Sequence, residues 1–282
     1  CYKARTDRED VEKMLTGDML RRATVRFPHK TAIIWGDRRT SYAALNADAN
    51  RFAHALHKLG LGKGDKVGIV SRNRTEYGTI FFGAAKSGCV LVNVSVLYAP
   101  DELEYVLNKA DVQVLIHEDL FAEKIVAVKP KCPKIRHCFV IGPEFDDLIA
   151  GESADEPVVA IDERDPFCMT YTGGTTGRPK GVLASHRARA TTAHTVMVEE
   201  KIDERDIVGI VTPMFHIAAL NIMFQPAILA GATTTLLSKW DPRDFAKMVR
   251  ETKMTANFMV PTQAGMVMQD PAFDAADYAT WR

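Results

Sequence analysis

Short apolar runs alternate with longer amphipathic stretches along most of the chain. The short runs are rich in β-branched residues, as strands are, and the longer stretches repeat apolar residues every three or four positions, as a buried helix face does. A β-hairpin is expected over residues 30–42, with its turn at Gly36-Asp37. Ser41 is expected to cap a following helix, which Gly60 ends.

The same alternation continues to the end of the chain. Further strands are expected at residues 67–70, 90–96, 112–117, 135–141, 166–172, 182–185, 206–212, 232–237 and 256–260. Further helices are expected at residues 75–86, 100–109, 120–128, 187–200, 217–229, 242–252 and 262–269. Strands that alternate with helices of this length predict an α/β fold of layered parallel sheets with helices on both faces. Residues 142–165, rich in Pro, Gly and acids, are expected to form a surface excursion and a subdomain boundary.

Composition places the chain among globular proteins. Of its 282 residues, 46% are apolar and 26% are charged, which suits one large domain or two smaller ones. Lys plus Arg equals Asp plus Glu at 36 each, so there is no general attraction to nucleic acid. Five widely spaced cysteines without a CxxC pair indicate a reducing, cytoplasmic setting. No apolar run is long enough to span a membrane, and the first residues are too charged for a signal peptide, so a soluble protein is expected.

Residues 171–181, YTGGTTGRPKG, concentrate what a polyphosphate needs. Glycines allow a positive φ and close approach to a ligand, and successive N–H groups in such a turn can form a nest for anions. The threonines add hydroxyl donors, two cations add charge, and a proline stiffens the exit. The residues expected to bind phosphate are Thr172, Gly173, Gly174, Thr175, Thr176, Gly177, Arg178, Pro179 and Lys180.

Two other interpretations of this loop fit less well. A P-loop NTPase is excluded because Pro179 precedes Lys180 and Gly181 follows it, where a Walker loop has Gly before its Lys and Ser or Thr after it. A plain glycine turn between strands does not call for three threonines and two cations. The loop therefore favours an anion-binding role.

The loop resembles the signature of the adenylate-forming superfamily, which includes acyl- and aryl-CoA synthetases, luciferases and peptide-synthetase adenylation domains. It matches the pattern Y-T-[STG]-G-T-T-G-x-P-K-G throughout. The surrounding text, including FPHKTAIIWGDRRTSYAALNADANRFAHAL and GLGKGDKVGIVSRNRTEY, is most similar to fatty acyl-CoA synthetases. The resemblance covers essentially the whole chain and implies part of the large N-terminal domain of such an enzyme.

The resemblance also implies a reaction. ATP would activate a carboxylic acid, expected to be a fatty acid, to an acyl-adenylate, and CoA would then accept the acyl group. Residues 172–180 would hold the β- and γ-phosphates, with Lys180 as a catalytic cation and Thr172 also placing Mg²⁺. His216, in PMFHIAALN, would lie near the carboxylate as a second catalytic residue, although a lone His in an apolar run is more often a core residue. Residues 260–262, VPT, would either line the acyl pocket or simply start a helix.

Family elements that complete the nucleotide site are not found before Arg282. These are an adenine-contacting turn, a Y-G-x-T-E element, a T-G-D element and a C-terminal domain with a catalytic Lys. Residues 1–282 are therefore expected to be an incomplete AMP-binding N-terminal domain, without the C-terminal domain and inactive alone. The alternatives are an acyl-AMP ligase feeding a carrier protein, an aryl-acid ligase, or a nucleotide-binding fragment without catalysis. The sequence carries no indication of oligomeric state.

Overall fold

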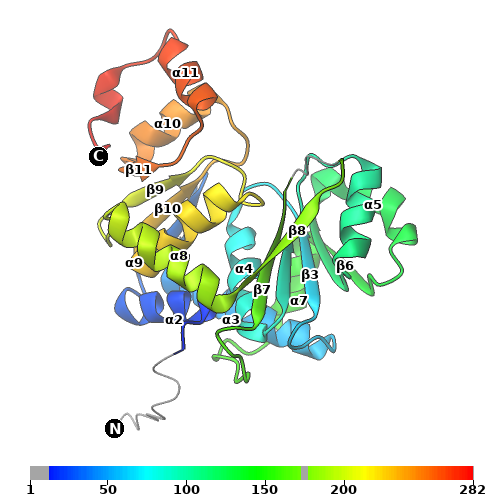
Figure 1. Ribbon diagram of the computed structural model, residues 1–282. Coiled ribbons are helices and arrows are strands. Elements are labelled where there is room, and N and C mark those ends of the chain that lie inside the picture. Colours follow the sequence, from blue (N-terminus) through cyan, green and yellow to red (C-terminus); the bar gives the residue numbers. More distant parts are fainter. Residues whose placement is uncertain (1–12, 173–176, 282) are drawn as a thin grey trace, which may run out of the picture.

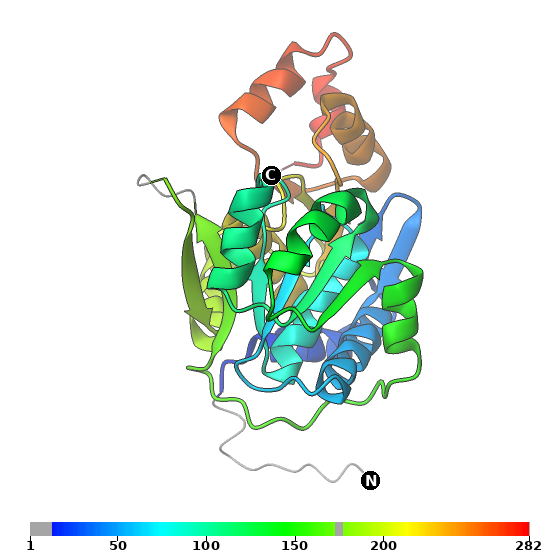
Figure 2. The ribbon, with the colours of Figure 1, turned by 90° about the vertical axis from the view of Figure 1, so that its right-hand side faces the viewer.

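A computed structural model of the chain describes residues 13–172 and 177–281, in which two β-sheets are flanked and separated by helices (Figures 1 and 2). Sheet A has the strand order β11-β9-β10-β1-β2, and sheet B has the order β6-β5-β3-β4-β7-β8. The strands of sheet A are β1 (Thr31–Trp35), β2 (Arg38–Ser41), β9 (Ile207–Ile210), β10 (Thr233–Leu236) and β11 (Ala256–Asn257). The strands of sheet B are β3 (Lys66–Val70), β4 (Val90–Asn93), β5 (Val114–Glu118), β6 (His137–Ile141), β7 (Pro166–Thr172) and β8 (Lys180–Ser185).

The expected hairpin and the helix after it are confirmed. Trp35 pairs with Arg38, so Gly36-Asp37 forms the turn, and Gly36 has a φ of 56°. The Ser41 hydroxyl accepts a hydrogen bond from the backbone N–H of Ala44 at 3.2 Å and caps helix α3 (Tyr42–Lys58).

Both sheets are mixed, whereas parallel sheets were expected. Most neighbouring strands are parallel, but β2 and β8 each run antiparallel to their neighbours at one edge. The antiparallel direction of β8 follows from the short connection between β7 and β8, residues 173–179. A connection this short cannot carry a crossover helix between parallel strands. Residues 172 and 180 are therefore placed opposite each other in one ladder.

Helix α4 (Thr75–Ser87) lies between the two sheets, and every one of its residues is buried (Figure 1). Its Phe81 ring lies 5.0 Å from the ring of Phe167 on β7 and 6.4 Å from that of Phe224. A Cβ on Gly83 would lie 2.6 Å from the Phe52 ring and 2.8 Å from the backbone oxygen of Ala49, so α3 and α4 can approach this closely only with glycine there.

The other helices cover the outer faces and the C-terminal end of the fold. They are α2 (Thr16–Arg26), α5 (Pro100–Lys109), α6 (Ala122–Val128), α7 (Pro143–Ala150), α8 (His186–Glu199), α9 (Gln225–Ala230), α10 (Pro242–Thr252) and α11 (Pro261–Gln269). Short 3₁₀ turns are η1 (Asp119–Phe121), η2 (Lys129–Lys131) and η4 (Ala275–Tyr278). In both ribbon views α10 and α11 stand at the far end of the molecule, next to sheet A (Figures 1 and 2). Within residues 13–172 and 177–281, no helix has the length and apolar character needed to cross a membrane.

Three helical elements differ from expectation. Helix α2 was not predicted. Helix α7 falls in the expected surface excursion, where Pro143 starts the helix and Phe145 and Ile149, four positions apart, are buried on its inner face. The expected helix over residues 217–229 begins as a π-helical segment, η3 (Ala218–Phe224), and continues as α9. Residues 142–165 join β6 to β7, two strands of the same sheet.

Candidate nucleotide and acid site

The β7–β8 hairpin carries the phosphate-loop sequence. Thr172 ends β7 and pairs with Lys180, which starts β8, and the Thr172 hydroxyl donates to the backbone oxygen of Lys180 at 3.5 Å. Because β7 is parallel to β4, which is parallel to β3, the loop leaves sheet B at the carboxyl edge of those strands. Gly173, Gly174, Thr175 and Thr176 lie outside the described residues.

Two cations stand at the open end of this hairpin. Arg178 and Lys180 are exposed, and neither forms an ion pair with any described residue. The Arg178 guanidinium carbon lies 5.0 Å from the ring centre of Tyr105 on α5, which orients the side chain by a cation–π contact. Gly177 has a φ of 95°, and Pro179 is buried. Residues 177–180 thus present positive charge that no other described residue neutralises, as an anion site requires.

The packing of Tyr171 against Gly181 explains why the loop motif begins with tyrosine and ends with glycine. They pair across the hairpin, and a Cβ on Gly181 would lie 3.0 Å from the Tyr171 ring. A side chain at position 181 would therefore displace the ring. Burial, reinforced by the nearby Tyr105 and Tyr98, raises the pKa of Tyr171 to about 12, so the phenol stays neutral behind the loop.

His216 comes from sheet A, on the segment that follows β9. Its backbone N–H donates to Pro213 at 2.9 Å, and its Nδ1 accepts from the N–H of Ala218 at 3.2 Å. Because Nδ1 is an acceptor, the proton of the neutral ring lies on Nε2, which can donate to a ligand. The imidazole is exposed. This arrangement suits the carboxylate-binding role expected of His216 better than a core role.

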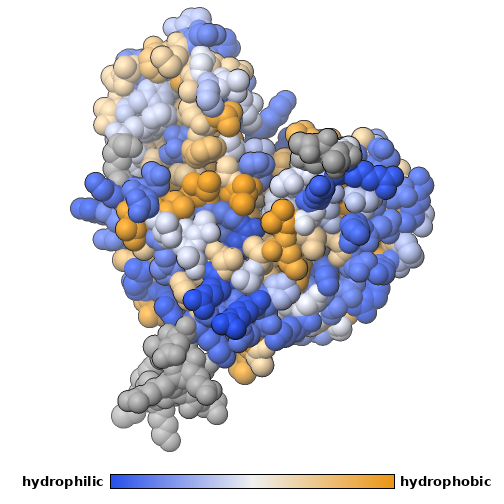
Figure 3. Space-filling model, in the orientation of Figure 1, coloured by the Kyte–Doolittle hydropathy of each residue, from blue (hydrophilic) through white to orange (hydrophobic). Residues whose placement is uncertain are grey.

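A cleft of about 310 Å³ lies where the carboxyl edges of the two sheets meet. Its walls are mostly apolar or aromatic, with Arg72 and Lys239 as cations; neither of these forms an ion pair with another described side chain. Figure 3 shows the outline of the molecule notched between the C-terminal helices and sheet B. The residues that line the cleft are Arg72, Asn73, Val96, Leu97, Phe121, Val211, Pro213, Phe215, Leu237, Ser238, Lys239, Trp240 and Gln263.

The cleft brings together only part of the expected site. Phe215 lines it, but its neighbour His216 and Lys180 do not. Pro261 starts helix α11, which agrees with the helix-start interpretation of VPT. The next residue, Gln263, lines the cleft, and its Oε1 accepts from the backbone N–H of Val260 at 3.1 Å.

Several cleft residues were missed by sequence reasoning. Arg72 and Asn73 follow β3, and the segment from Leu237 to Trp240 follows β10. In α/β folds ligands bind outside the carboxyl ends of parallel strands, so the polar residues just after each strand were the available signal.

His186 packs in the protein interior and does not line the cleft. Ser185 caps α8 through the N–H of Ala188, so His186 is not the cap. The His186 ring is buried, stacks 4.9 Å from Phe167, and its Nδ1 accepts from the N–H of Thr16 at 3.3 Å. Burial lowers the pKa of His186 to about 4 against the opposing charge of Asp165, so the ring is neutral at pH 7.

The described residues do not form a protein-held Mg²⁺ site by themselves. In the part of the chain that the structure describes, no group of three or more His, Cys, Asp or Glu side chains could hold a metal ion. Mg²⁺ usually takes carboxylates, waters and substrate phosphates, and Thr172 offers a single hydroxyl. Thr172 as an Mg²⁺ ligand stays a prediction.

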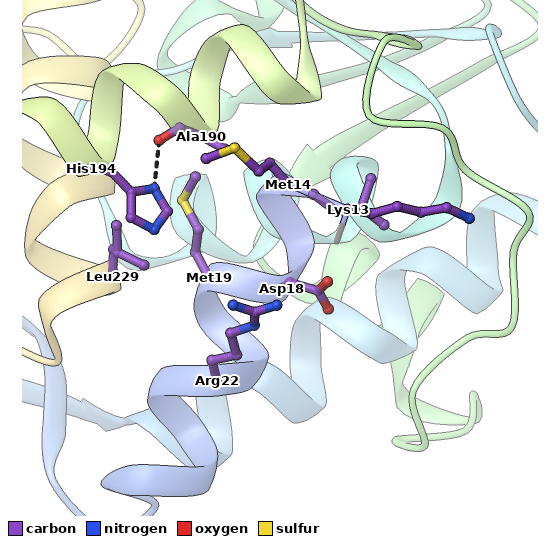
Figure 4. A pocket seen from close by; sticks show the side chains of 9 residues that line it. Lys13, Met14, Asp18, Met19, Arg22, Ala190, His194 and Leu229 are labelled. Atoms are coloured by element: carbon purple, nitrogen blue, oxygen red, sulfur yellow. Dashed lines mark hydrogen bonds between the residues drawn. The ribbon is translucent and has the colours of Figure 1, made fainter. Parts of the chain in front are cut away.

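Two other surface features lie away from the cleft. A hollow between α2, α8 and α9 is lined by Asp18, Arg22 and His194, among others, and His194 Nδ1 is bonded to the Ala190 carbonyl at 2.8 Å (Figure 4). Val182 and Leu183 on β8 are 53% and 52% exposed and contribute to apolar surface over that strand (Figure 3). Neither feature contains an expected site residue.

A mixed α/β domain with a cationic hairpin loop and a cleft at the carboxyl edges of its two sheets has the layout of a nucleotide-binding domain. The chain belongs to the AMP-binding enzyme family, which it matches over residues 20–282. The expected fold, part of the N-terminal domain of an adenylate-forming enzyme, is confirmed.

Individual relatives agree with this family. The chain is 31% identical over 297 residues to a medium/long-chain-fatty-acid–CoA/3-oxocholest-4-en-26-oate–CoA ligase of Mycobacterium marinum, covering 92% of this chain and 52% of that protein. It is 31% identical over 257 residues to a feruloyl-CoA synthase of an Amycolatopsis species, covering 90% and 50%. It superposes on the inhibitor-bound N-terminal domain of FACL13 from Mycobacterium tuberculosis with a TM-score of 0.86 and 29% identity, covering 94% of this chain and 68% of that one. The chain spans about half the length of the curated relatives it matches.

Proposed function

We propose that the protein to which this chain belongs activates a carboxylic acid with ATP and transfers the acyl group to CoA. A carboxylate oxygen attacks the α-phosphorus, the bond to the bridging oxygen breaks, and pyrophosphate leaves. The CoA sulfur then attacks the acyl carbon and AMP leaves, which forms a thioester. The observation that carries this proposal is a pair of exposed cations, Arg178 and Lys180, that have no ion-pair partner within residues 13–172 and 177–281 and lie on a loop with the complete family signature.

The main obstacle in the first step is electrostatic, because two anions must approach each other. Lys180 and Arg178 reduce that repulsion by drawing charge toward the β- and γ-phosphates, where pyrophosphate develops. The N–H groups and hydroxyls of residues 172–177 add donors to the same phosphates. His216 donates from Nε2 to the acid and fixes its carboxylate without removing its charge.

The acid is proposed to be a fatty acid, and an aryl acid is the alternative. The two curated relatives, one named for fatty and steroid acids and one for ferulate, are both 31% identical to this chain, so identity does not separate the two. The apolar and aromatic cleft walls suit a long apolar arm, and Arg72 and Lys239 suit an anionic end such as the phosphates of CoA. A carrier protein in place of CoA would present the same kind of arm.

We also propose that residues 1–282 alone form one wall of the adenylation site and do not complete the reaction. Mg²⁺ would arrive with ATP, bound chiefly to phosphate oxygens, and Thr172 would add one oxygen. This domain assignment rests on the resemblance and on the share of its relatives that the chain covers.

The test combines binding with exchange. Calorimetric titration of the 282-residue chain with MgATP is expected to show binding that Lys180→Ala weakens. ATP–pyrophosphate exchange with saturated fatty acids, ferulate and benzoate is expected to stay at background for this chain. A version extended by the C-terminal half of the Mycobacterium marinum relative is expected to show acid-dependent exchange. ATP binding without exchange in the extended version would favour the nucleotide-binding alternative, and absence of ATP binding as well as exchange in the extended version would contradict the proposal.

A further inference from the structure

Asn73 connects the two sheets at the floor of the cleft. It lies just after β3 of sheet B and is 2% exposed. Its Nδ2 donates to the backbone oxygens of Thr212 at 2.8 Å, Leu237 at 3.1 Å and Ile210 at 3.2 Å. Its Oδ1 accepts from the N–H of Met214 at 2.7 Å. Every one of these partners follows or ends β9 or β10 of sheet A.

The main chain of Asn73 is held to the same sheet. The Ser238 hydroxyl donates to the Asn73 carbonyl at 3.0 Å, and the indole N–H of Trp35 donates to that hydroxyl at 2.7 Å. Ser238 follows β10 and Trp35 ends β1, so three strands of sheet A are joined to one position of sheet B. Polar bonds with this degree of burial are costly to leave unmade and fix geometry closely.

Only a side-chain amide matches this environment. The site presents backbone oxygens on one side and a backbone N–H on the other, so it needs an NH₂ donor and an oxygen acceptor on one short side chain. An aspartate would keep the acceptor for Met214 but turn a charged oxygen toward the carbonyls. A leucine would leave all of these backbone groups without the amide.

The bonded segment is the one that carries His216. Met214, two residues before His216, is fully buried and held by Asn73, and Pro213 receives the backbone N–H of His216. Lys180 belongs to sheet B, on β8, whereas His216 extends from sheet A. The position of His216 relative to the phosphate loop therefore depends on how the two sheets are joined at this edge.

We propose that Asn73 is a positioning residue that sets where His216 stands relative to the phosphate loop. The proposal rests on the proposed function for its catalytic consequence, but the placement of His216 can be tested without catalysis. Asn73 lines the cleft, but its amide is bonded to the protein, so it acts through the segment from Thr212 to His216.

Asn50 is the matched control. It is also a buried asparagine, 1% exposed, that bonds through both ends of its amide. Its Nδ2 donates to Ala154 at 2.8 Å and its Oδ1 accepts from Lys86 at 2.7 Å. These bonds join α3 and α4 to the surface segment after α7, away from the cleft. Substitution of Asn50 should therefore cost stability without moving His216.

The experiment compares Asn73→Asp with Asn50→Asp in the 282-residue chain labelled with ¹⁵N-histidine. The imidazole resonances of His216 should shift in Asn73→Asp relative to wild type, with both proteins measured at the same pH. Amide exchange of Met214 should accelerate by roughly 10- to 100-fold, because the segment that carries it loses the Nδ2 bonds to Thr212 and Leu237, although the acceptor for its own N–H remains. Both signals should match wild type in Asn50→Asp. If Asn73→Asp does not fold, Asn73→Ser replaces it, with the same shift and acceleration expected.

The catalytic part of the experiment uses the chain extended by the C-terminal half of the Mycobacterium marinum relative, which is expected to show exchange. Asn73→Asp should lower kcat by roughly 10- to 100-fold, as misplaced catalytic groups do, with the KM for ATP within about twofold of wild type. A folded Asn73 variant with unmoved His216 resonances, or an Asn50 variant that moves them equally, would overturn the proposal. Failure of the proposed function would look different: the wild-type protein would show no exchange while Asn73→Asp still displaced His216.

Discussion

The two ends of the β7–β8 hairpin hold cationic and titratable groups in opposite ways. At the loop end, Arg178 and Lys180 are exposed and have no ion-pair partner among the described residues. At the other end, where the chain enters α8, His186 and Arg189 are 0% and 3% exposed. The same pair of strands therefore presents charge to a ligand at one end and encloses polar groups at the other.

This difference separates binding from stability. An exposed cation is solvated in both the folded and the unfolded chain, so it contributes little to the free energy of unfolding. Its charge instead contributes to the affinity for an anion. A buried imidazole or guanidinium interacts with the protein interior and contributes to the free energy of unfolding. Substitutions at the loop end should therefore change ligand affinity and rate, and substitutions at the α8 end should change stability and its pH dependence.

The largest expected effect is acid destabilisation through His186. Burial lowers its pKa from 6.5 to about 4, so the unfolded chain binds this proton at a higher pH than the folded chain does. Stability is complete above pH 6.5 and falls as the pH drops toward 4. The loss should reach about 2 kcal/mol between pH 7.5 and pH 5. Urea unfolding of wild type and His186→Gln over this range measures it, because glutamine does not titrate.

The pH window isolates His186 from the acids. The pKa values of Glu76, Glu156 and Asp165 are lowered by their basic partners and hydrogen bonds, so their losses begin below their ordinary values of 4.5, 4.5 and 3.8. His29→Gln, which removes an exposed imidazole, is the control and should keep the wild-type slope. An unchanged slope in His186→Gln would show that the buried ring does not carry the effect.

Lys180→Ala tests the loop end. Loss of one charge-assisted hydrogen bond, about 1.5–3 kcal/mol, should slow adenylation by roughly 10- to 150-fold and weaken ATP binding by a similar factor. The free energy of unfolding should stay within about 0.5 kcal/mol of wild type, because the side chain is exposed. Calorimetry, pyrophosphate exchange in the extended version and urea unfolding measure the three quantities.

Lys58→Ala removes another exposed lysine, paired with Glu152 on the far side of the fold, and should leave ATP affinity unchanged. Equal ATP affinity in Lys180→Ala and wild type would remove Lys180 from the phosphate site. A large loss of stability in Lys180→Ala would contradict the expectation that substitutions at the loop end change ligand binding rather than stability.

The sequence predicts the strands that flank the loop because their information is local. Gly181, for example, acts on the ring of its pairing partner Tyr171. The β1–β2 turn and the Ser41 cap were predicted for the same reason. Local backbone requirements and short-range hydrogen bonds can be inferred from spacing alone.

The sequence does not predict the contacts that join the two sheets at the cleft, because the residues that form these contacts are far apart along the chain. Asn73 bonds to residues 137 to 165 positions away, and no spacing rule connects them. Arg189 on α8 sits in a stretch without a clear apolar stripe, so its burial against β7 could not be inferred. The π-helical turns of η3 depend on packing between α8 and sheet A, which a 3.6-residue period does not encode.

Arg189→Met tests the α8 end of the hairpin, where the cation is buried. In the part of the chain that the structure describes, the acceptors of Arg189 Nη2 are the Cys168 sulfur at 3.2 Å and the Thr170 hydroxyl at 3.4 Å. Its Nε and Nη1 are buried and have no acceptor among the described residues. Methionine fills similar space without these donors, so the free energy of unfolding should rise by about 1–3 kcal/mol. Urea unfolding at pH 7.5 measures the change.

Arg187→Met is the control for Arg189→Met, two positions earlier on the same helix. Arg187 is exposed and paired with Glu163 at 2.7 Å, so its loss should lower stability by at most about 1 kcal/mol. Opposite signs for the two substitutions would support the distinction between enclosed and exposed cations. A less stable Arg189→Met protein would mean that the guanidinium is stabilised by something beyond these neutral contacts.

The smallest expected effect comes from the ring that orients Arg178. Tyr105→Leu removes the aromatic face 5.0 Å from the guanidinium but leaves the cation in place. An exposed cation–π contact contributes about 0.5–1 kcal/mol, so ATP binding should weaken by only about two- to fivefold. Tyr105→Phe keeps the ring face and should bind ATP as wild type does. If Tyr105→Leu weakened binding as much as Arg178→Ala, the ring would be essential for holding the cation toward phosphate. If Arg178→Ala had no effect, Lys180 would be the only one of these two cations that the ligand uses.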